Sequence, residues 1–243
     1  RALDRIVSIL EIYSSATVIE IGPGHGELTR RILDQNPKHV VAIEKDVRMV
    51  NEFLEPLLKE NPSLEVVSGD ALEILKEHAN KFGDYKLIGN IPYYITGRLL
   101  RLLGEIKNKP RVISLTLQKE VAERLCGEPL KMNLLAATVG FWGKPTLIRY
   151  ISKKSFKPAP KVHSALVRIE PSGTFSDEES LKYYKLVKAL FAHPRKTALN
   201  NLKPLQIDIE MLEKYQIEPK ARPQNLSIEK IRQLSSTLSS DTL

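Results

Sequence analysis

Short β-branched runs alternate with helix-like segments over the first two-thirds of the chain. We predict strands at Thr17–Ile21, His39–Glu44, Leu64–Ser68, Tyr85–Gly89 and Arg111–Thr116. The segments between them, 26–34, 46–60, 71–80 and 97–103, have helical patterns. Strands with helical spacers of this length form βαβ units, in which the strands are parallel and helices cover both faces of the sheet. The alternation therefore predicts an α/β fold.

The pattern changes after a further predicted helix at 119–125. Two more strands are expected at 146–151 and 163–169, joined by a proline-rich loop, which completes a mostly parallel sheet of seven strands. The polar segment 170–179 is the best domain boundary. Beyond it we predict helices at 181–191, 196–202, 209–215 and 228–238, with Ser227 as the N-cap of the last. We expect a sheet domain over 1–172 and a small helical domain over 173–243.

The charge is positive and unevenly distributed. The 37 Lys and Arg against 29 Asp and Glu give a net charge of +8. No acidic residue occurs from Pro129 to Ile169, nor from Ser180 to Ile207. The first stretch contains Lys161, and the second contains Arg195 and Lys196. A solvated basic face is one interpretation, but separate acid-free stretches favour a surface for nucleic acid.

The composition excludes several classes of protein. The chain has no stretch of about 18 apolar residues, so no membrane-spanning helix and no membrane partner are expected. The single cysteine, Cys126, favours a reducing, cytoplasmic compartment. The five histidines have no metal-ligand spacing, so no metal is expected. We also expect a monomer.

Small and acidic residues follow the first three predicted strands. The turn with Gly22 and Gly24 lets a backbone approach a ligand closely, although it can also be only a tight turn. Glu44 can accept the hydroxyls of an adenosine ribose, or serve as an acid at a helix start. Asp70, before Ala71, can accept from an adenine amine, or cap a helix. Together these residues favour a nucleoside-bearing ligand, either NAD or S-adenosylmethionine.

The tetrapeptide after the fourth strand separates these two cofactors. An adenine amine is a poor nucleophile, because its lone pair is delocalised into the ring. The Asn90 side-chain oxygen and the Ile91 carbonyl can accept its hydrogens and turn the lone pair toward an incoming methyl group. Pro92 keeps these acceptors aimed, and Tyr93 offers a ring on which the base can stack. The pattern therefore predicts methyl transfer to adenine, with S-adenosylmethionine as the cofactor.

These residues resemble the S-adenosylmethionine-dependent rRNA adenine N6,N6-dimethyltransferases. The likeness includes EIGPGHGELT, Asn90–Tyr93 and SFKPAPKVHSALVRIEP at 155–171. It continues through FAHPRKTALNNLK at 191–203 and IEPKARPQNLSIEKI at 217–231, and so covers almost the whole chain. The last two segments resemble the branch that modifies two adjacent adenosines near the 3′ end of small-subunit rRNA.

The resemblance implies a Rossmann-like class I methyltransferase fold and a role for each matching residue. Gly22 and Gly24 would line the methionine end of the cofactor, Glu44 would hold the ribose, and Asp70 and Ala71 would hold the adenine. Asn90 would touch both cofactor and target. Phe156 would close the second face of the target base, or could be an ordinary apolar plug beneath the proline-rich loop. Lys161 would bind the phosphate backbone. Arg195 and Lys196 are expected to bind rRNA as well.

Two departures from the family pattern stand out. The family's Gln-x-Phe-Leu segment, which closes over the cofactor, is absent, and the chain begins at Arg1 rather than Met. We therefore expect a segment upstream of the given sequence. Tyr94 stands where the family often has a second Asn, and it is assigned no role.

Three other functions fit parts of the pattern. A large-subunit rRNA methyltransferase that confers antibiotic resistance shares the site. A non-catalytic ribosome-assembly factor could keep the same fold. A role in small-subunit biogenesis does not exclude methyl transfer, because one protein can do both. An NAD-dependent dehydrogenase would need a general acid–base pair beside the crevice, and the sequence offers none.

Overall fold

The computed structural model describes residues 2–155, 161–173 and 175–239. The chain forms two compact units. The first comprises Arg1–Ala122 with Pro145–Pro171, and the second comprises Glu123–Lys144 with Ser172–Leu243. No helix in the described ranges is long and apolar enough to cross a membrane.

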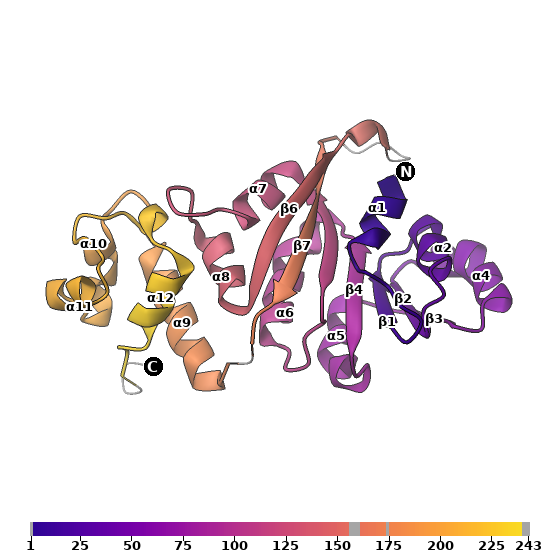
Figure 1. Ribbon diagram of the computed structural model, residues 1–243, viewed down its shortest axis with the longest axis horizontal. Coiled ribbons are helices and arrows are strands. Elements are labelled where there is room, and N and C mark those ends of the chain that lie inside the picture. The colour runs from indigo at the N-terminus through magenta and orange to yellow at the C-terminus, as the bar shows by residue number, and fades with distance from the viewer. Residues whose placement is uncertain (1, 156–160, 174, 240–243) are drawn as a thin grey trace. The chain divides into compact units, whose positions relative to one another are not determined.

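A seven-stranded sheet is the framework of the first unit (Figure 1). Its strand order is β3-β2-β1-β4-β5-β7-β6. The strands are β1 Thr17–Ile21, β2 His39–Glu44, β3 Leu64–Ser68, β4 Tyr85–Asn90, β5 Ile113–Gln118, β6 Gly143–Ile151 and β7 Ser164–Pro171. The pairs β1–β2, β1–β4, β2–β3 and β4–β5 are parallel, whereas β5 and β7 are antiparallel. The predicted mostly parallel sheet of seven strands is confirmed.

Helices follow the strands as the sequence predicted, with a few differences. The helices of the first unit are α1 Ala2–Ser8, α2 Glu27–Leu33, α3 Val47–Met49, α4 Glu55–Glu60, α5 Ala71–His78 and α6 Thr96–Glu105, and α7 Lys119–Leu125 crosses into the second unit. The helix predicted over 46–60 is interrupted by a π-helical turn, Val50–Leu54, next to Pro56, which lacks the N–H that a continuous helix would use. The regular part of β5 begins at Ile113, two residues later than predicted.

The core of the first unit explains why its strands are apolar throughout. Val18 and Val40 lie in a cluster with residues of α1, α2 and α4, and both side chains are fully buried. Ile19 and Val41 are also 0 % exposed, and they point to the opposite face of the sheet because strand side chains alternate. Burial on both faces is typical of parallel sheets and fixes the strand ends that carry the site.

The second unit is helical. Its helices are α8 Leu134–Trp142, α9 Asp177–Leu190, α10 Ala198–Leu202, α11 Ile209–Lys214 and α12 Ile228–Ser235. The predicted cap is confirmed, since the Ser227 hydroxyl accepts the Lys230 N–H at 3.3 Å. Helix α9 begins four residues earlier than predicted, because Ser176 and Glu179 form a reciprocal capping box.

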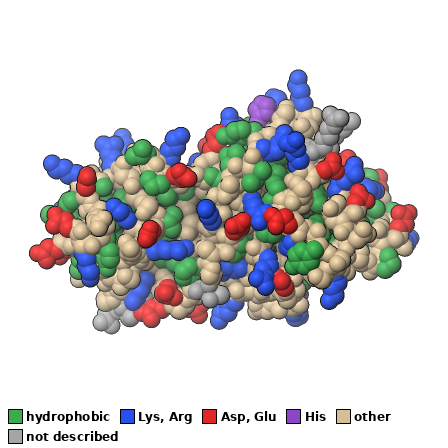
Figure 2. All heavy atoms as spheres, in the orientation of Figure 1, with side chains coloured by type: hydrophobic (Ala, Val, Ile, Leu, Met, Phe, Trp, Pro, Cys, Tyr) green, Lys and Arg blue, Asp and Glu red, His purple; other side chains and the backbone are tan. Residues whose placement is uncertain are grey.

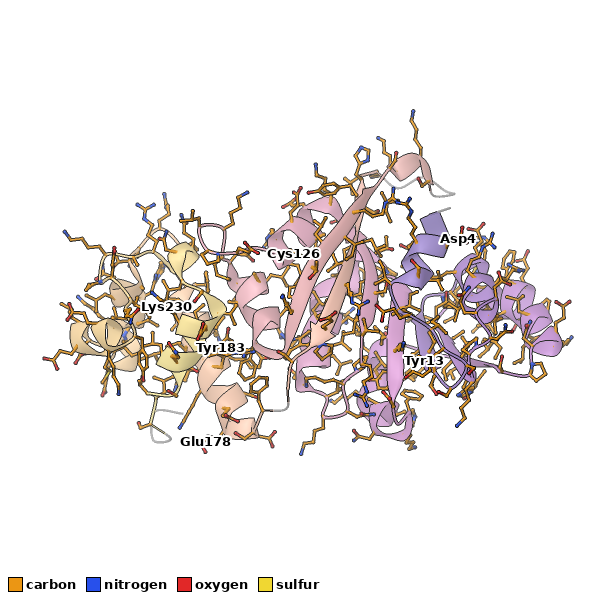
Figure 3. The ribbon with its side chains drawn as sticks, viewed as in Figure 1. Asp4, Tyr13, Cys126, Glu178, Tyr183 and Lys230 are labelled. Atoms are coloured by element: carbon orange, nitrogen blue, oxygen red, sulfur yellow. The ribbon has the colours of Figure 1, made fainter. Side chains whose placement is uncertain are left out.

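Residues 123–144 correct the predicted division of the chain at 172/173. They include α8, which was not predicted as a helix and lies in the second unit. The Tyr183 hydroxyl of α9 donates to the Ala137 carbonyl of α8 at 2.8 Å (Figure 3), and Trp142 is fully buried. The apolar faces of α8 are therefore covered by helices that come later in the sequence.

Candidate cofactor and substrate site

The carboxyl ends of β1, β2, β3 and β4 lie side by side at one edge of the sheet. The Gly22 N–H, after β1, donates to the Ile43 carbonyl of β2 at 3.0 Å. The Gly69 N–H, after β3, donates to the Glu44 carbonyl of β2 at 2.9 Å. The strand order reverses between β1 and β4, and in open α/β sheets this is where ligands bind. The structure thus brings the predicted cofactor residues together.

The glycine loop after β1 contains Gly22, Gly24 and Gly26. One part of this loop faces open space, and another part packs against a neighbouring helix. Gly22, Gly24 and Gly26 have φ values of 67°, 54° and 73°, which are left-handed conformations that favour glycine. A Cβ at Gly24 would meet no atom within 4 Å, whereas one at Gly26 would lie 2.7 Å from Leu57 Cδ1. Gly24 therefore leaves room for a ligand, and Gly26 lets α2 approach α4.

Glu44 is held by three backbone N–H groups. Its Oε2 accepts from Gly24 at 3.0 Å, and its Oε1 accepts from Lys45 at 2.8 Å and Asp46 at 2.9 Å. The carboxylate is partly exposed and fixed in position. Both interpretations from the sequence fit this geometry, since Glu44 supports the start of α3 and also faces the glycine loop.

Asp70 also has two partners. Its Oδ1 caps α5 by accepting the Leu72 N–H at 2.9 Å, and its Oδ2 accepts from Lys45 Nζ at 3.0 Å. The Leu72 hydrogen bond, followed by the Lys45 interaction, lowers the pKa of Asp70. The carboxylate is therefore ionised, and Lys45 covers one of its oxygens. Ala71 beside it is buried.

The Asn90–Tyr93 turn follows β4 and lies next to the glycine loop. Asn90 is exposed, Ile91 is buried, and a 3₁₀ turn at Tyr93–Ile95 leads into α6. A Cβ at Gly22 would lie 3.9 Å from the Asn90 carbonyl oxygen, so the loop and the turn approach each other closely. The Ile95 N–H donates to the Pro92 carbonyl at 3.1 Å and fixes the turn.

The residues predicted to bind RNA lie in both units. Lys161, in the first unit, and Arg195 and Lys196, in the second, are exposed. The Lys196 N–H donates to the His193 carbonyl at 2.9 Å, so Arg195 lies within a defined turn. Phe156 and the side chain of Tyr93 lie outside the described residues, so their predicted stacking roles stay predictions.

Glu20, the penultimate residue of β1, was not predicted as a site residue. Its side chain is 0 % exposed, and within the described ranges neither carboxylate oxygen has a hydrogen-bond partner. Burial raises the pKa of Glu20 to about 8, while the nearby Thr29 hydroxyl opposes the shift and the Glu44 charge adds to it. The available signal was an ionisable residue in an otherwise apolar strand, directly before the glycine loop.

The fold and this edge define a class of protein. Rossmann-like methyltransferases have a mostly parallel seven-stranded sheet with β7 antiparallel, and a glycine loop after β1 that faces an acid at the end of β2. A family model described as ribosomal RNA adenine dimethylase matches residues 1–240. The chain belongs to this family, whose members are S-adenosylmethionine-dependent methyltransferases.

Individual relatives agree with this assignment. Ribosomal RNA small subunit methyltransferase A of Dehalococcoides mccartyi (strain CBDB1) is 34% identical over 242 residues, which are 96% of this chain and 82% of the relative. The protein of the same name from Clostridium botulinum (strain ATCC 19397 / Type A) is 35% identical over 244 residues, with coverages of 96% and 87%. The crystal structure of a dimethyladenosine transferase from Plasmodium falciparum matches with a TM-score of 0.81 and 27% identity, over 96% of this chain and 93% of that chain. The predicted family, fold class and enzyme class are confirmed.

Proposed function

We propose that this protein transfers methyl groups from S-adenosylmethionine to the N6 atoms of two adjacent adenosines near the 3′ end of small-subunit rRNA. The observation that carries the proposal is the meeting of the glycine loop, Glu44, Asp70 and the Asn90 turn at one edge of the sheet. The small-subunit relatives favour this substrate over large-subunit rRNA.

The described residues fit a cofactor of this kind. Gly24 faces open space where a ligand can approach the backbone. Glu20 is a buried carboxyl group without a partner, and a cationic ligand beside it would compensate for the cost of its ionisation. S-adenosylmethionine supplies a methyl group on a positively charged sulfur, together with an ammonium group and an adenosine.

Each cofactor-binding residue then has a defined task. Gly22 and Gly24 line the methionine end, and Glu44 accepts the ribose hydroxyls. Ala71 packs against the adenine, while the Asp70 carboxylate accepts its amine. Because Lys45 already donates to Asp70 Oδ2, the adenine amine must share this oxygen or displace the lysine.

Methyl transfer needs the target amine aimed at the cofactor's methyl group. The Asn90 side-chain oxygen and the Ile91 carbonyl accept hydrogen bonds from the amine, and Pro92 restricts the turn that holds both. Tyr93 and Phe156 stack on the two faces of the base. Lys161, Arg195 and Lys196 bind rRNA phosphates, so that binding weakens as salt concentration rises. We further propose that the enzyme acts as a monomer in the cytoplasm, where it contributes to small-subunit biogenesis.

The test is mass spectrometry of rRNA after incubation of the protein with unmethylated small ribosomal subunits, large subunits and an isotope-labelled methyl donor. We expect labelled N6,N6-dimethyladenosine at two adjacent positions near the 3′ end of the small-subunit rRNA. Label in large-subunit rRNA instead would favour the resistance-type activity. Binding to the small subunit without any label would favour a non-catalytic assembly factor.

A further inference from the structure

The end of the sheet at which Asn90 lies extends across the neighbouring strands β5 and β7, beyond the proposed methyl-transfer site. In the β4–β5 register Asn90 is opposite Thr116, and in the β5–β7 register Gln118 is opposite Ser164. The Lys119 N–H, directly after β5, donates to the His163 carbonyl at 3.0 Å, directly before β7. Lys119 and His163 therefore lie at the same end of the sheet as Asn90, one and two strands further along.

An exposed tyrosine lies next to this end on β6, the edge strand beyond β7 (Figure 1). Tyr150 is 50% exposed, and Lys119 Nζ lies 5.1 Å from the centroid of its ring. Ile148, two residues earlier and so on the same face of the strand, is 42% exposed. Tyr150 therefore presents an aromatic ring at the surface, beside a second exposed apolar side chain on the same strand.

The basic residues around Tyr150 favour a negatively charged binding partner. Lys and Arg are interspersed with Asp and Glu over the face of the molecule in Figure 2. An RNA-binding surface is therefore identified by a local excess of basic residues and not by the net charge of the chain. Six exposed basic or ionisable residues lie near this end of the sheet. They are Lys119 at the start of α7, Arg149 on β6, Lys153 and Lys154 in the turn after β6, and Lys161 and His163 in the segment before β7. Two exposed acids, Glu120 and Glu123, follow Lys119 on α7.

We propose that rRNA nucleotides flanking the target adenosine bind along this edge, with one base stacked on the ring of Tyr150 and its phosphates bound by Lys119 and the neighbouring cations. The inference rests on the proposed function for the identity of the RNA. Neighbouring strands are about 4.8 Å apart, so Tyr150 lies roughly 14 Å from β4, within reach of nucleotides near the target. Aromatic stacking combined with lysine and arginine contacts is how proteins bind unpaired nucleotides.

A matched control exists in the same unit. Tyr13 is 48% exposed, and Lys86 Nζ lies 4.3 Å from the centroid of its ring (Figure 3). It precedes β1, at the amino ends of the parallel strands and so at the other end of the sheet from Asn90. Tyr13→Ala therefore removes a tyrosine of similar exposure that also lies next to a lysine, away from the proposed RNA path.

The experiment measures the affinity of the full chain for unmethylated small-subunit rRNA, without cofactor, together with its affinity for S-adenosylmethionine. We expect Tyr150→Ala to weaken RNA binding about tenfold, the loss typical of one stacked base. Tyr150→Phe and Tyr13→Ala should remain within about twofold of the parent, and cofactor affinity should not change. Lys119→Met should lower the slope of log affinity against log salt by about one.

The outcomes separate this inference from the proposed function. The inference is overturned if Tyr150→Ala binds RNA as tightly as the parent does. It is also overturned if the parent binds no RNA. A parent that binds RNA through Tyr150 but transfers no methyl group would support the inference and overturn the proposed function. Thermal melting of each variant confirms that it is folded.

Discussion

Gly24 donates its backbone N–H to Glu44 Oε2 at 3.0 Å, and this hydrogen bond joins the loop after β1 to the acid at the end of β2. The two residues are 20 positions apart in the sequence. The contact sets the position of the glycine loop and the direction of the carboxylate at once. A change at Glu44 should therefore affect both cofactor binding and the loop.

Replacing Glu44 by Gln should weaken cofactor binding by about 10- to 100-fold. Charge-assisted hydrogen bonds contribute about 1.5–3 kcal/mol, and the amide loses the charge while it keeps the size of the side chain. Isothermal titration with S-adenosylmethionine measures the effect. Glu65→Gln on β3, an exposed acid paired with His39, is the control and should bind as the parent does. An unchanged affinity in Glu44→Gln would refute the ribose-binding role.

Glu20 should make stability and cofactor binding depend on pH. Its pKa is raised to about 8 by burial, so the folded state holds a proton that the unfolded state releases near its ordinary value of 4.5. The free energy of unfolding should therefore decrease as the pH rises from about 4.5 to about 8, and should level off above that value. Glu20→Gln should remove this part of the dependence and be more stable than the parent at pH 9, as chemical denaturation across pH can measure.

The same substitution gives a second measurement. If Glu20 becomes ionised when the cationic cofactor binds, the parent should release a proton on binding at pH 7, and Glu20→Gln should not. Calorimetry in buffers with different ionisation enthalpies reports this proton. Equal proton release by both proteins would place its source elsewhere.

Asn90→Ala should slow methyl transfer with little effect on RNA affinity. Loss of one preorganised hydrogen-bonding group in an active site costs about 2–4 kcal/mol of barrier, which is about 30- to 1000-fold in rate. Single-turnover transfer of labelled methyl groups to small subunits measures the rate. Tyr94→Ala is the comparison in the same turn, because Tyr94 is 75% exposed and has no assigned role. A parent-like rate in Asn90→Ala would contradict the acceptor role.

Gly89→Ala should destabilise the protein and disturb the Asn90 turn. A Cβ at Gly89 would lie 2.5 Å from Ile91 Cδ1 and 3.0 Å from the Ile21 carbonyl, so the buried Ile91 side chain must move and β1 must give by a few tenths of an ångström. Such overpacking costs about 1–3 kcal/mol. Gly97→Ala in α6 is the control, since its Cβ would meet no atom within 4 Å and should be neutral or slightly stabilising. Urea denaturation of the two variants gives the comparison.

The sequence was informative wherever structure depends on neighbouring residues. The βαβ alternation, the glycine turn and the positions of Glu44 and Asp70 at strand ends are local patterns, and parallel pairing brings such ends to one edge. The Ser227 cap is likewise a short-range signal. Helix α8 was missed because its residues are apolar on all sides and show no helical period.

By itself, then, the sequence determined the fold class and the family, and it identified the residues that lie at the carboxyl ends of β1 to β4. Only the tertiary structure decided that Glu20 is buried without a partner, that α8 lies with helices from much later in the chain, and that Lys119 lies over Tyr150. The physical reason is that desolvation and packing depend on groups far apart in the sequence. A local pattern identifies an ionisable or aromatic residue, but the rest of the fold decides what surrounds it.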